Sequence, residues 1–283
     1  MSAISSSSAV PVIGIFAIQG AVEEHANCVK RCGGDVKEIR MPKDFEGLDG
    51  IILPGGESTT MAIVGERWGL FPKLRDWVGA NKPIWGTCAG MILLSDHAIK
   101  QAEGGQSLVG GLDVHVCRNF FGSQMQSCEV DVSLAQSTTA GGPCNSLGRN
   151  GDGASKCPAV FIRAPAILSA GPGVEVLASV VARPHLSAQA DVMRVIDEAT
   201  AADTNGPGSA KRRISSHRPR SDGKPTTSHI GPSGQFGQSD EEVEVFVAVQ
   251  MDNILATAFH PELTEDLRWH QYFLEIVQRH KNN

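Results

Sequence analysis

The sequence lacks a membrane span, an excess of basic residues and a targeting segment. No apolar run approaches the ~20 residues that a membrane-spanning helix needs, so no membrane partner is expected. The formal net charge over 283 residues is −6, which argues against a nucleic-acid partner. The first ten residues are rich in serine but contain no arginine. We therefore expect no cleaved targeting peptide and predict a cytoplasmic protein.

The sequence also lacks a paired cysteine framework. Its seven cysteines are spread without regular spacing, which is typical of a protein in a reducing compartment. Cys28 and Cys32 lie four residues apart on a predicted helix and could share a metal ion. No second Cys or His pair has a matching spacing, so we interpret both as buried helix residues and predict no metal site.

The most informative segment that is present runs from Lys82 to Leu94. It reads as a short apolar strand, then Gly-Thr-Cys-Ala-Gly, then an apolar helix. This is the layout of a nucleophile elbow with Cys88 as the nucleophile. The flanking glycines are expected because a sharp strand-to-helix turn leaves no room for side chains beside the nucleophile. The N-terminal end of the helix favours the thiolate form of Cys88.

A base for this nucleophile is predicted near the end of the chain. An apolar strand at 255–259 is followed by His260-Pro261-Glu262. Residues two apart in an extended backbone point to the same side, so Glu262 is expected to reach one nitrogen of His260. The other nitrogen is then free to face Cys88. These three residues form the nucleophile, base and orienting group of a predicted catalytic triad.

A glycine-rich turn supplies a third part of the predicted site. The strand at 50–53 leads into Pro54-Gly55-Gly56-Glu57-Ser58. Backbone amides in such a turn can hold a developing oxyanion, and we expect the amides of Gly56 and Ala89 to do so. A phosphate-binding loop is the competing interpretation. The segment lacks the Gly-Lys-Ser/Thr ending of that loop, and the charge of Glu57 would repel phosphate.

With three further segments, these motifs resemble those of class I glutamine amidotransferases. The narrower resemblance is to the PdxT/SNO family, the glutaminase subunits of pyridoxal 5'-phosphate synthase. The further segments are Ala17-Ile-Gln-Gly with Glu24-His25, Arg118-Asn-Phe-Phe-Gly-Ser-Gln and Phe161-Ile-Arg-Ala-Pro. All segments occur in the family's order between Val12 and about Val277.

The resemblance implies a fold and an activity. The implied fold is α/β, a flavodoxin-like three-layer class I glutamine amidotransferase fold with a mostly parallel central sheet and helices on both faces. The implied reaction is hydrolysis of L-glutamine to L-glutamate and ammonia through a thioester on Cys88, with no cofactor. The implied partner is a (β/α)8-barrel synthase subunit in a complex of twelve plus twelve subunits. This partner uses the ammonia to make pyridoxal 5'-phosphate (vitamin B6), which is the product of the complex.

The resemblance also implies which residues hold glutamine. A guanidinium suits the α-carboxylate because it can bind both oxygens. Gln19 is expected to support the oxyanion loop. The remaining histidines, His25 among them, show no partner pattern and are expected in surface or packing roles. The implied glutamine-binding residues are Gly56, Glu57, Ser58, Arg118, Ile162 and Arg163.

Three alternative functions remain open at this point. The chain could be the glutaminase subunit of another class I amidotransferase, although such a subunit should lack the Arg118 and Phe161 segments. It could be a γ-glutamyl peptidase on the same scaffold. It could also be a non-catalytic regulatory subunit, against which the complete triad argues.

The pattern of elements predicts a single domain over residues 10–281. Strands alternate with helices in the first half, which predicts a parallel sheet, whereas the second half reads as antiparallel strands. Segments 135–156 and 187–240 exceed the family pattern and are predicted to be loop or disordered, with a short helix near 190–201. The basic residues at 211–213 and 218–220 are interpreted as part of a solvated loop, with a nuclear localisation signal as the alternative.

Overall fold

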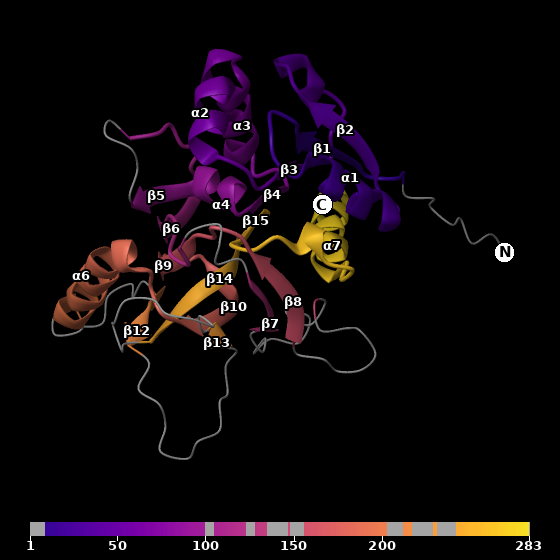
Figure 1. Ribbon diagram of the computed structural model, residues 1–283. Helices are drawn as coiled ribbons and strands as arrows, with labels where there is room; N and C mark the ends of the chain where they lie inside the picture. Colours follow the sequence, from indigo (N-terminus) through magenta and orange to yellow (C-terminus); the bar gives the residue numbers. More distant parts are fainter. Residues whose placement is uncertain are drawn as a thin grey trace.

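The computed structural model describes residues 9–99, 105–122, 128–134, 147, 156–202, 212–216, 229–230 and 242–282. The chain forms one mixed sheet with the strand order β2-β1-β3-β4-β15-β14-β10-β7-β8. Helices flank the first strands of this order on both sides (Figure 1). The predicted α/β class with a large central sheet is therefore confirmed.

The first five strands in this order are all parallel. They are β2 (Asp35–Ile39), β1 (Val12–Phe16), β3 (Gly50–Leu53), β4 (Ile84–Thr87) and β15 (Ile254–Thr257). All residues of β3, β4 and β15 are buried, as expected for parallel strands covered on both faces. The carboxyl ends of parallel strands are where an open α/β sheet places its site. In this protein those ends lead into the Gly-Gly turn, the Cys88 turn and His260.

Four helices cover the parallel strands. Figure 1 shows α1 (Val22–Arg31) and α7 (Arg268–Asn282) on one side, and α2 (Ser58–Arg67) and α3 (Leu70–Gly79) on the other. Residues 58–79 form two separate helices, α2 and α3. Gly69 adopts φ 69° between them, a left-handed conformation that ends the first helix and that glycine adopts without strain.

The remaining strands are mainly antiparallel, as the second half of the sequence predicts. The main sheet continues through β14 (Val243–Met251), β10 (Glu175–Ala182), β7 (Cys128–Leu134) and β8 (Lys156–Phe161). Outside the two insertions, two described strands were not predicted: β5 (Ser95–Ile99), which pairs in parallel with β6 (Leu112–Cys117), and β9 (Ala166–Ala170), which links β6 to β14. All five residues of β9 are buried, so no polar alternation signals it as a strand.

The predicted insertions are described only in part. The helix expected near 190–201 is present as α6 (Leu186–Ala202), so residues 187–202 are not a loop. Three two-residue strands lie further along: β11 (Arg212–Arg213) pairs with β9, β12 (Ser215–Ser216) with β14, and β13 (His229–Ile230) with β10. The rest of 187–240, including 218–220, and all of 135–156 except residues 147 and 156 lie outside the described residues.

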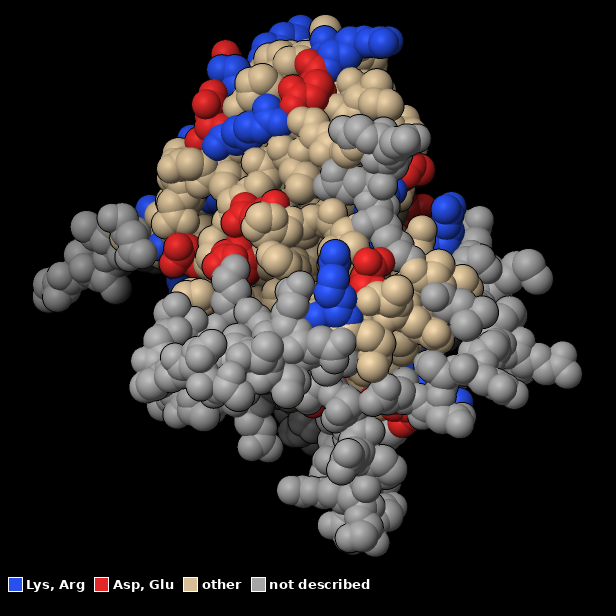
Figure 2. All heavy atoms as spheres, turned by 90° about the vertical axis from the view of Figure 1, so that its left-hand side faces the viewer, with Lys and Arg blue, Asp and Glu red and all other residues tan. Residues whose placement is uncertain are grey.

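The described surface mixes charges of both signs. On the face shown in Figure 2, Lys and Arg alternate with Asp and Glu over the described atoms. Among the helices that the structure describes, none combines the length and apolarity needed to cross a bilayer.

Candidate active site

Cys88 occupies a strained turn between β4 and α4 (Ala89–Leu94). Its φ of 48° and ψ of −101° are unusual for a residue with a side chain, and such strain is concentrated at functional sites. The flanking glycines are sterically required. A Cβ at Gly86 would lie 2.4 Å from the carbonyl carbon of Gly90, and a Cβ at Gly90 would lie 2.0 Å from the carbonyl oxygen of Leu53. The turn therefore has the geometry of a nucleophile elbow.

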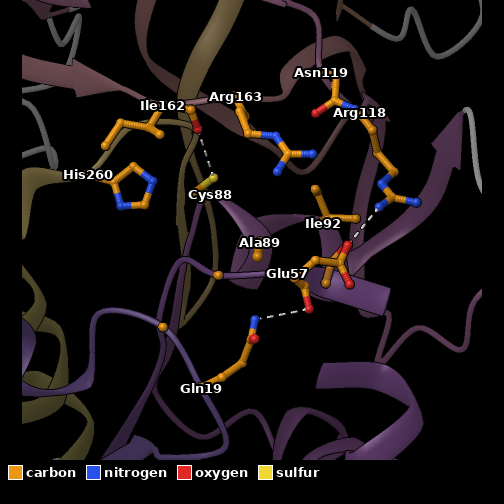
Figure 3. Close-up of a pocket in the computed structure, with 13 residues that line it drawn as sticks. Gln19, Glu57, Cys88, Ala89, Ile92, Arg118, Asn119, Ile162, Arg163 and His260 are labelled. Carbon is orange, nitrogen blue, oxygen red and sulfur yellow. Dashed lines mark hydrogen bonds and ion pairs between the residues drawn. The ribbon is translucent and has the colours of Figure 1, made fainter. Parts of the chain in front are cut away.

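The Cys88 turn is fastened to the strand that carries the predicted base. The backbone amide of Cys88 donates to the carbonyl of Thr257 at 2.8 Å, and Thr87 and Thr257 lie opposite each other in the parallel ladder. The thiol lies 3.9 Å from the carbonyl oxygen of Ile162. Figure 3 shows the His260 ring next to this thiol. Neighbouring strands thus bring nucleophile and base together although they are far apart in the sequence.

The His260 imidazole is held by Glu262. Its Nδ1 atom lies 2.7 Å from Oε1 of the carboxylate, and both residues are buried. The predicted route to this contact is wrong, because residues 261–263 form a 3-10 turn, η4 (Pro261–Leu263), and not an extended segment. Proline at the first position of the turn fixes φ for a helical start. The turn brings the carboxylate back to the ring of the residue that precedes it.

The electrostatics of the pair favour a charged His260. Burial disfavours the imidazolium, but hydrogen bonds and negative charge from Cys88 and Glu262 outweigh it and raise the pKa of His260 to about 10. Burial likewise disfavours the Glu262 carboxylate, yet His25 and His260 overcome it and lower its pKa. The site is therefore arranged to hold an imidazolium next to a carboxylate, with the sulfur of Cys88 on the other side of the ring.

A cavity of about 340 Å³ opens in front of Cys88 and collects nearly all the predicted site residues. Glu262 is the exception, because it lies behind His260. Figure 3 shows the cavity residues projecting from several different elements. Ile92 and Asn119 also line it, although sequence reasoning did not single them out. The predicted residues that line the cavity are Gln19, Gly56, Glu57, Ser58, Cys88, Ala89, Arg118, Ile162, Arg163 and His260.

The Gly-Gly turn is locked against the loop after β1. The carbonyl of Gly55 accepts from the amide of Ala21 at 3.2 Å. In a trans peptide the next N–H points the opposite way, so the Gly56 amide points away from that loop. The Gln19 side chain donates to the carbonyl of Glu57 at 3.2 Å. Ala89 begins α4, where a helix leaves its first amides without an internal partner.

Glu57 and Arg118 form one side of the cavity. The Oε2 atom of Glu57 accepts from the backbone amide of Thr60 at 2.8 Å and so caps α2. Its Oε1 atom lies 3.5 Å from Nη2 of Arg118. Ser58 donates its hydroxyl to the side chain of Gln106 at 3.2 Å. These polar groups are positioned by helix capping and by one another before any substrate binds.

Arg163 faces the same cavity. Its backbone lies in the left-handed region at φ 49°, as does Asn119 at φ 53°. Figure 3 shows the guanidinium of Arg163 directed into the cavity, and within the described part of the chain no ion pair of this group is found. A strained backbone that presents a guanidinium suits recognition of a carboxylate.

The structure also places chemistry behind the triad that sequence reasoning missed. His25 and His270 are both buried, and the Nε2 atom of His25 lies 3.4 Å from Oε2 of Glu262. The helical period offered a signal, because His25 shares the buried face of α1 with Cys28 and Val29. A buried histidine requires a polar partner. No group of three or more His, Cys, Asp and Glu side chains suited to a metal ion occurs among the described residues.

Comparison with known proteins finds a matching family model, similar sequences and a similar solved structure. A model described as the SNO glutamine amidotransferase family matches residues 15–195 and 225–279. A relative from Arabidopsis thaliana named "Probable pyridoxal 5'-phosphate synthase subunit PDX2" is 42% identical, over 94% of this chain and 86% of the relative. "Pyridoxal 5'-phosphate synthase subunit PdxT" from Parafrankia sp. is 35% identical, over 95% and 94%. A solved structure titled as a glutamine amidotransferase is 30% identical with a TM-score of 0.61, over 94% of this chain and 98% of that one.

Proposed function

This chain belongs to the SNO glutamine amidotransferase family, and from that premise we propose that it is the glutaminase subunit of a pyridoxal 5'-phosphate synthase. It hydrolyses L-glutamine to L-glutamate and ammonia and passes the ammonia to a synthase subunit. The observation that carries the proposal is the strained Cys88 turn beside the His260–Glu262 pair, whose Nδ1–Oε1 distance is 2.7 Å.

The first half of the reaction forms a covalent intermediate. The Cys88 thiolate attacks the side-chain amide carbon of glutamine, and the amides of Gly56 and Ala89 stabilise the resulting oxyanion. His260 donates its Nε2 proton to the leaving nitrogen, so that the C–N bond breaks and ammonia departs. Glu262 holds the imidazole in the orientation that places this nitrogen towards Cys88.

The second half releases glutamate. The neutral His260 accepts a proton from a water molecule, which attacks the carbonyl carbon of the γ-glutamyl thioester. The C–S bond then breaks, and the thiolate and imidazolium are restored. Thiol and imidazole supply the nucleophile and all proton transfers, so the proposed steps use neither a metal nor an organic cofactor.

The cavity residues suit the two ends of glutamine differently. Arg163 directs its guanidinium into the cavity, where it can bind the α-carboxylate through two hydrogen bonds. Arg118 is already placed beside Glu57, so this pair suits the α-ammonium side of the substrate, where Glu57 supplies the negative charge. Ser58 and Ile162 complete the pocket walls.

The ammonia requires a partner protein. Ammonia released into neutral water becomes ammonium, which is no longer a nucleophile. The described chain presents one α/β sheet with this single triad, so the chemistry that consumes ammonia belongs to a second subunit. We propose a (β/α)8-barrel synthase in a complex of twelve plus twelve subunits in the cytoplasm. Gln19 and Gly20 line the cavity and α1 follows them in the chain, so this loop and helix suit docking.

The test is glutamate and ammonia release from glutamine with and without a pyridoxal 5'-phosphate synthase subunit. We expect release that the partner stimulates and that Cys88→Ala abolishes, while Cys88→Ala still binds glutamine. Gly79→Ala is a matched control, because a Cβ at Gly79 meets no atom within 4 Å. Unchanged ammonia release from Cys88→Ala would refute the triad. Hydrolysis of γ-glutamyl peptides in preference to glutamine would instead favour a peptidase.

A further inference from the structure

The catalytic carboxylate has two buried oxygens with different neighbours. Oε1 of Glu262 lies 2.7 Å from Nδ1 of His260, which is the triad contact. Oε2 lies 3.4 Å from Nε2 of His25, and the side chains of Glu262 and His25 are both fully buried. Within the described residues, Oε2 has no hydrogen-bond partner, so its approach to His25 is a close contact and not a formed hydrogen bond. His25 is therefore the polar group that can satisfy the second oxygen.

His25 is itself held by groups from separate elements. Its Nδ1 atom lies 3.0 Å from Nε2 of His270 in α7, and its Nε2 atom lies 3.1 Å from Oγ1 of Thr87 at the end of β4. The Trp85 ring packs edge-on against both imidazoles, with centroid distances of 5.5 Å to His25 and 4.9 Å to His270. Figure 1 shows α1, α7 and β4 meeting in this part of the fold.

The contacts select one arrangement of protons. If His270 carries its proton on Nε2, it donates to Nδ1 of His25. His25 then carries its own proton on Nε2, which donates to Oγ1 of Thr87 and is 3.4 Å from Oε2 of Glu262. The Nδ1 atom of His270 is then a lone pair, and it is buried without a hydrogen-bond partner among the described residues. The reverse arrangement would point the lone pair of His25 at the carboxylate, which is repulsive.

We propose that His25 is a positioning residue for the reaction, acting through the Nε2 group that it places beside the second oxygen of Glu262. The inference rests on the proposed function and deepens it. It extends the triad by a chain of contacting side chains, from His270 through His25 and Glu262 to His260 and the nucleophile. His25 touches neither substrate nor thiol.

The second contact matters because a carboxylate held at one oxygen can still rotate. The terminal torsion of a glutamate is broad and roughly two-fold, so the contact with His260 alone leaves the plane of the carboxylate free to turn. A donor on Oε2 fixes this plane and with it the direction of the imidazole. The Nε2 group of His25 also offers a donor to a buried charged oxygen, which is costly to leave unpaired.

Several ionisable groups lie around His25, and each can contribute to the pH profile of kcat/KM. Glu262 and His260 face it from the segment after β15, His270 from α7, and Glu24 from its own helix. Burial lowers the pKa of His25, and the charge of Glu262 opposes this only in part. Burial therefore favours the neutral form of His25, which still offers an N–H beside Glu262.

The experiment compares three substitutions of His25 in the full chain with its synthase partner. The amide nitrogen of His25→Gln reaches about as far as Nε2 and can still donate to Glu262. That of His25→Asn reaches only as far as Nδ1, on the side of His270, and His25→Leu donates to neither. We measure kcat, KM for glutamine, the pH profile of kcat/KM and the melting temperature of each.

We expect His25→Leu and His25→Asn to lower kcat by about tenfold to a hundredfold, the value of one hydrogen bond to a charged group. KM should change by less than about threefold, and the acidic limb of the profile should move to higher pH because Glu262 loses a donor. His25→Gln should recover most of kcat.

Wild-type kcat in His25→Leu would overturn the proposal. So would equal recovery by Gln and Asn, or a loss confined to the melting temperature, since either would indicate packing alone. If His25→Leu fails to fold, the comparison of Gln with Asn decides the question. A wild-type protein without partner-stimulated glutaminase activity would refute the proposed function itself, which separates the two failures.

Discussion

Gly55 is the position at which the smallest change should disable the site. A Cβ at Gly55 would lie 2.2 Å from Cε1, 2.9 Å from Nδ1 and 3.2 Å from Nε2 of His260. The φ angle of Gly55 is not among the positive ones, so alanine is compatible with the backbone there. The substitution Gly55→Ala therefore tests contact with the catalytic ring and not backbone strain.

The size of the effect follows from how far the ring must move. Restoring an ordinary contact of 3.4 Å from 2.2 Å requires a displacement of about 1.2 Å. The turn has little room to move away, because the Gly55 carbonyl accepts a hydrogen bond from the Ala21 amide. It also packs closely against Gly20, where an added Cβ would lie 1.7 Å from the same carbonyl oxygen. The ring therefore takes up the displacement. A misplacement of about 1 Å costs roughly a hundredfold in rate, so we expect kcat to fall by about that factor.

The assay is partner-stimulated glutamate release, with the melting temperature measured on the same samples. Gly79→Ala is the control, because it adds the same methyl group where no atom lies within 4 Å. It should leave kcat unchanged. A Gly55→Ala protein that folds and retains kcat within about threefold of wild type would show that the His260 ring position does not limit catalysis, and the reasoning would fail.

Three further predictions use other parts of the structure. The pKa of His260 rises to about 10 from 6.5, so its charged form stabilises the fold fully below pH 6.5, and this contribution is lost as pH rises towards 10. Chemical denaturation should show the loss as a fall in the free energy of unfolding. A Glu262→Gln protein in which this free energy falls equally steeply with pH would contradict the prediction. Arg163→Ala should raise KM for glutamine by about tenfold or more with less effect on kcat, which steady-state kinetics measures; an unchanged KM would place the α-carboxylate elsewhere. Burial raises the pKa of Cys157 to about 11, so iodoacetamide at pH 7 should alkylate Cys88 well before Cys157, as peptide mass mapping can check. The opposite order would contradict the assignment of Cys88 as the nucleophile.

Local sequence signals predicted most of the elements that carry the site. The strand at 50–53 was predicted with the bounds it has as β3, because four apolar residues end at a Pro-Gly-Gly turn. The elbow at Cys88 was equally readable, since its glycines are fixed by backbone contacts within that turn and with Leu53. Motifs whose geometry is set by nearby residues of the chain can therefore be recognised from the sequence alone.

The sequence was less informative where distant contacts decide the structure. The strand β9 was missed because it is buried throughout and shows no alternation. The extended backbone expected at 260–262 is a 3-10 turn, although the contact between His260 and Glu262 is the expected one. His25 was assigned a surface or packing role because its partners, at 87, 262 and 270, belong to other elements. Only the folded chain brings these groups together.

The pairing of β4 with β15 has a consequence for the order of synthesis. Trp85 and Thr257 are hydrogen-bonded across these strands but lie 172 residues apart. A ribosome adding about 5–20 residues per second needs roughly 10 to 30 seconds to pass from one to the other. During that interval β4 is an open sheet edge, a template for wrong pairing, and the nascent chain holds its thiol without a base. The last described strand to be made, β15, therefore joins the two parts of the sheet and completes the active site in the same step.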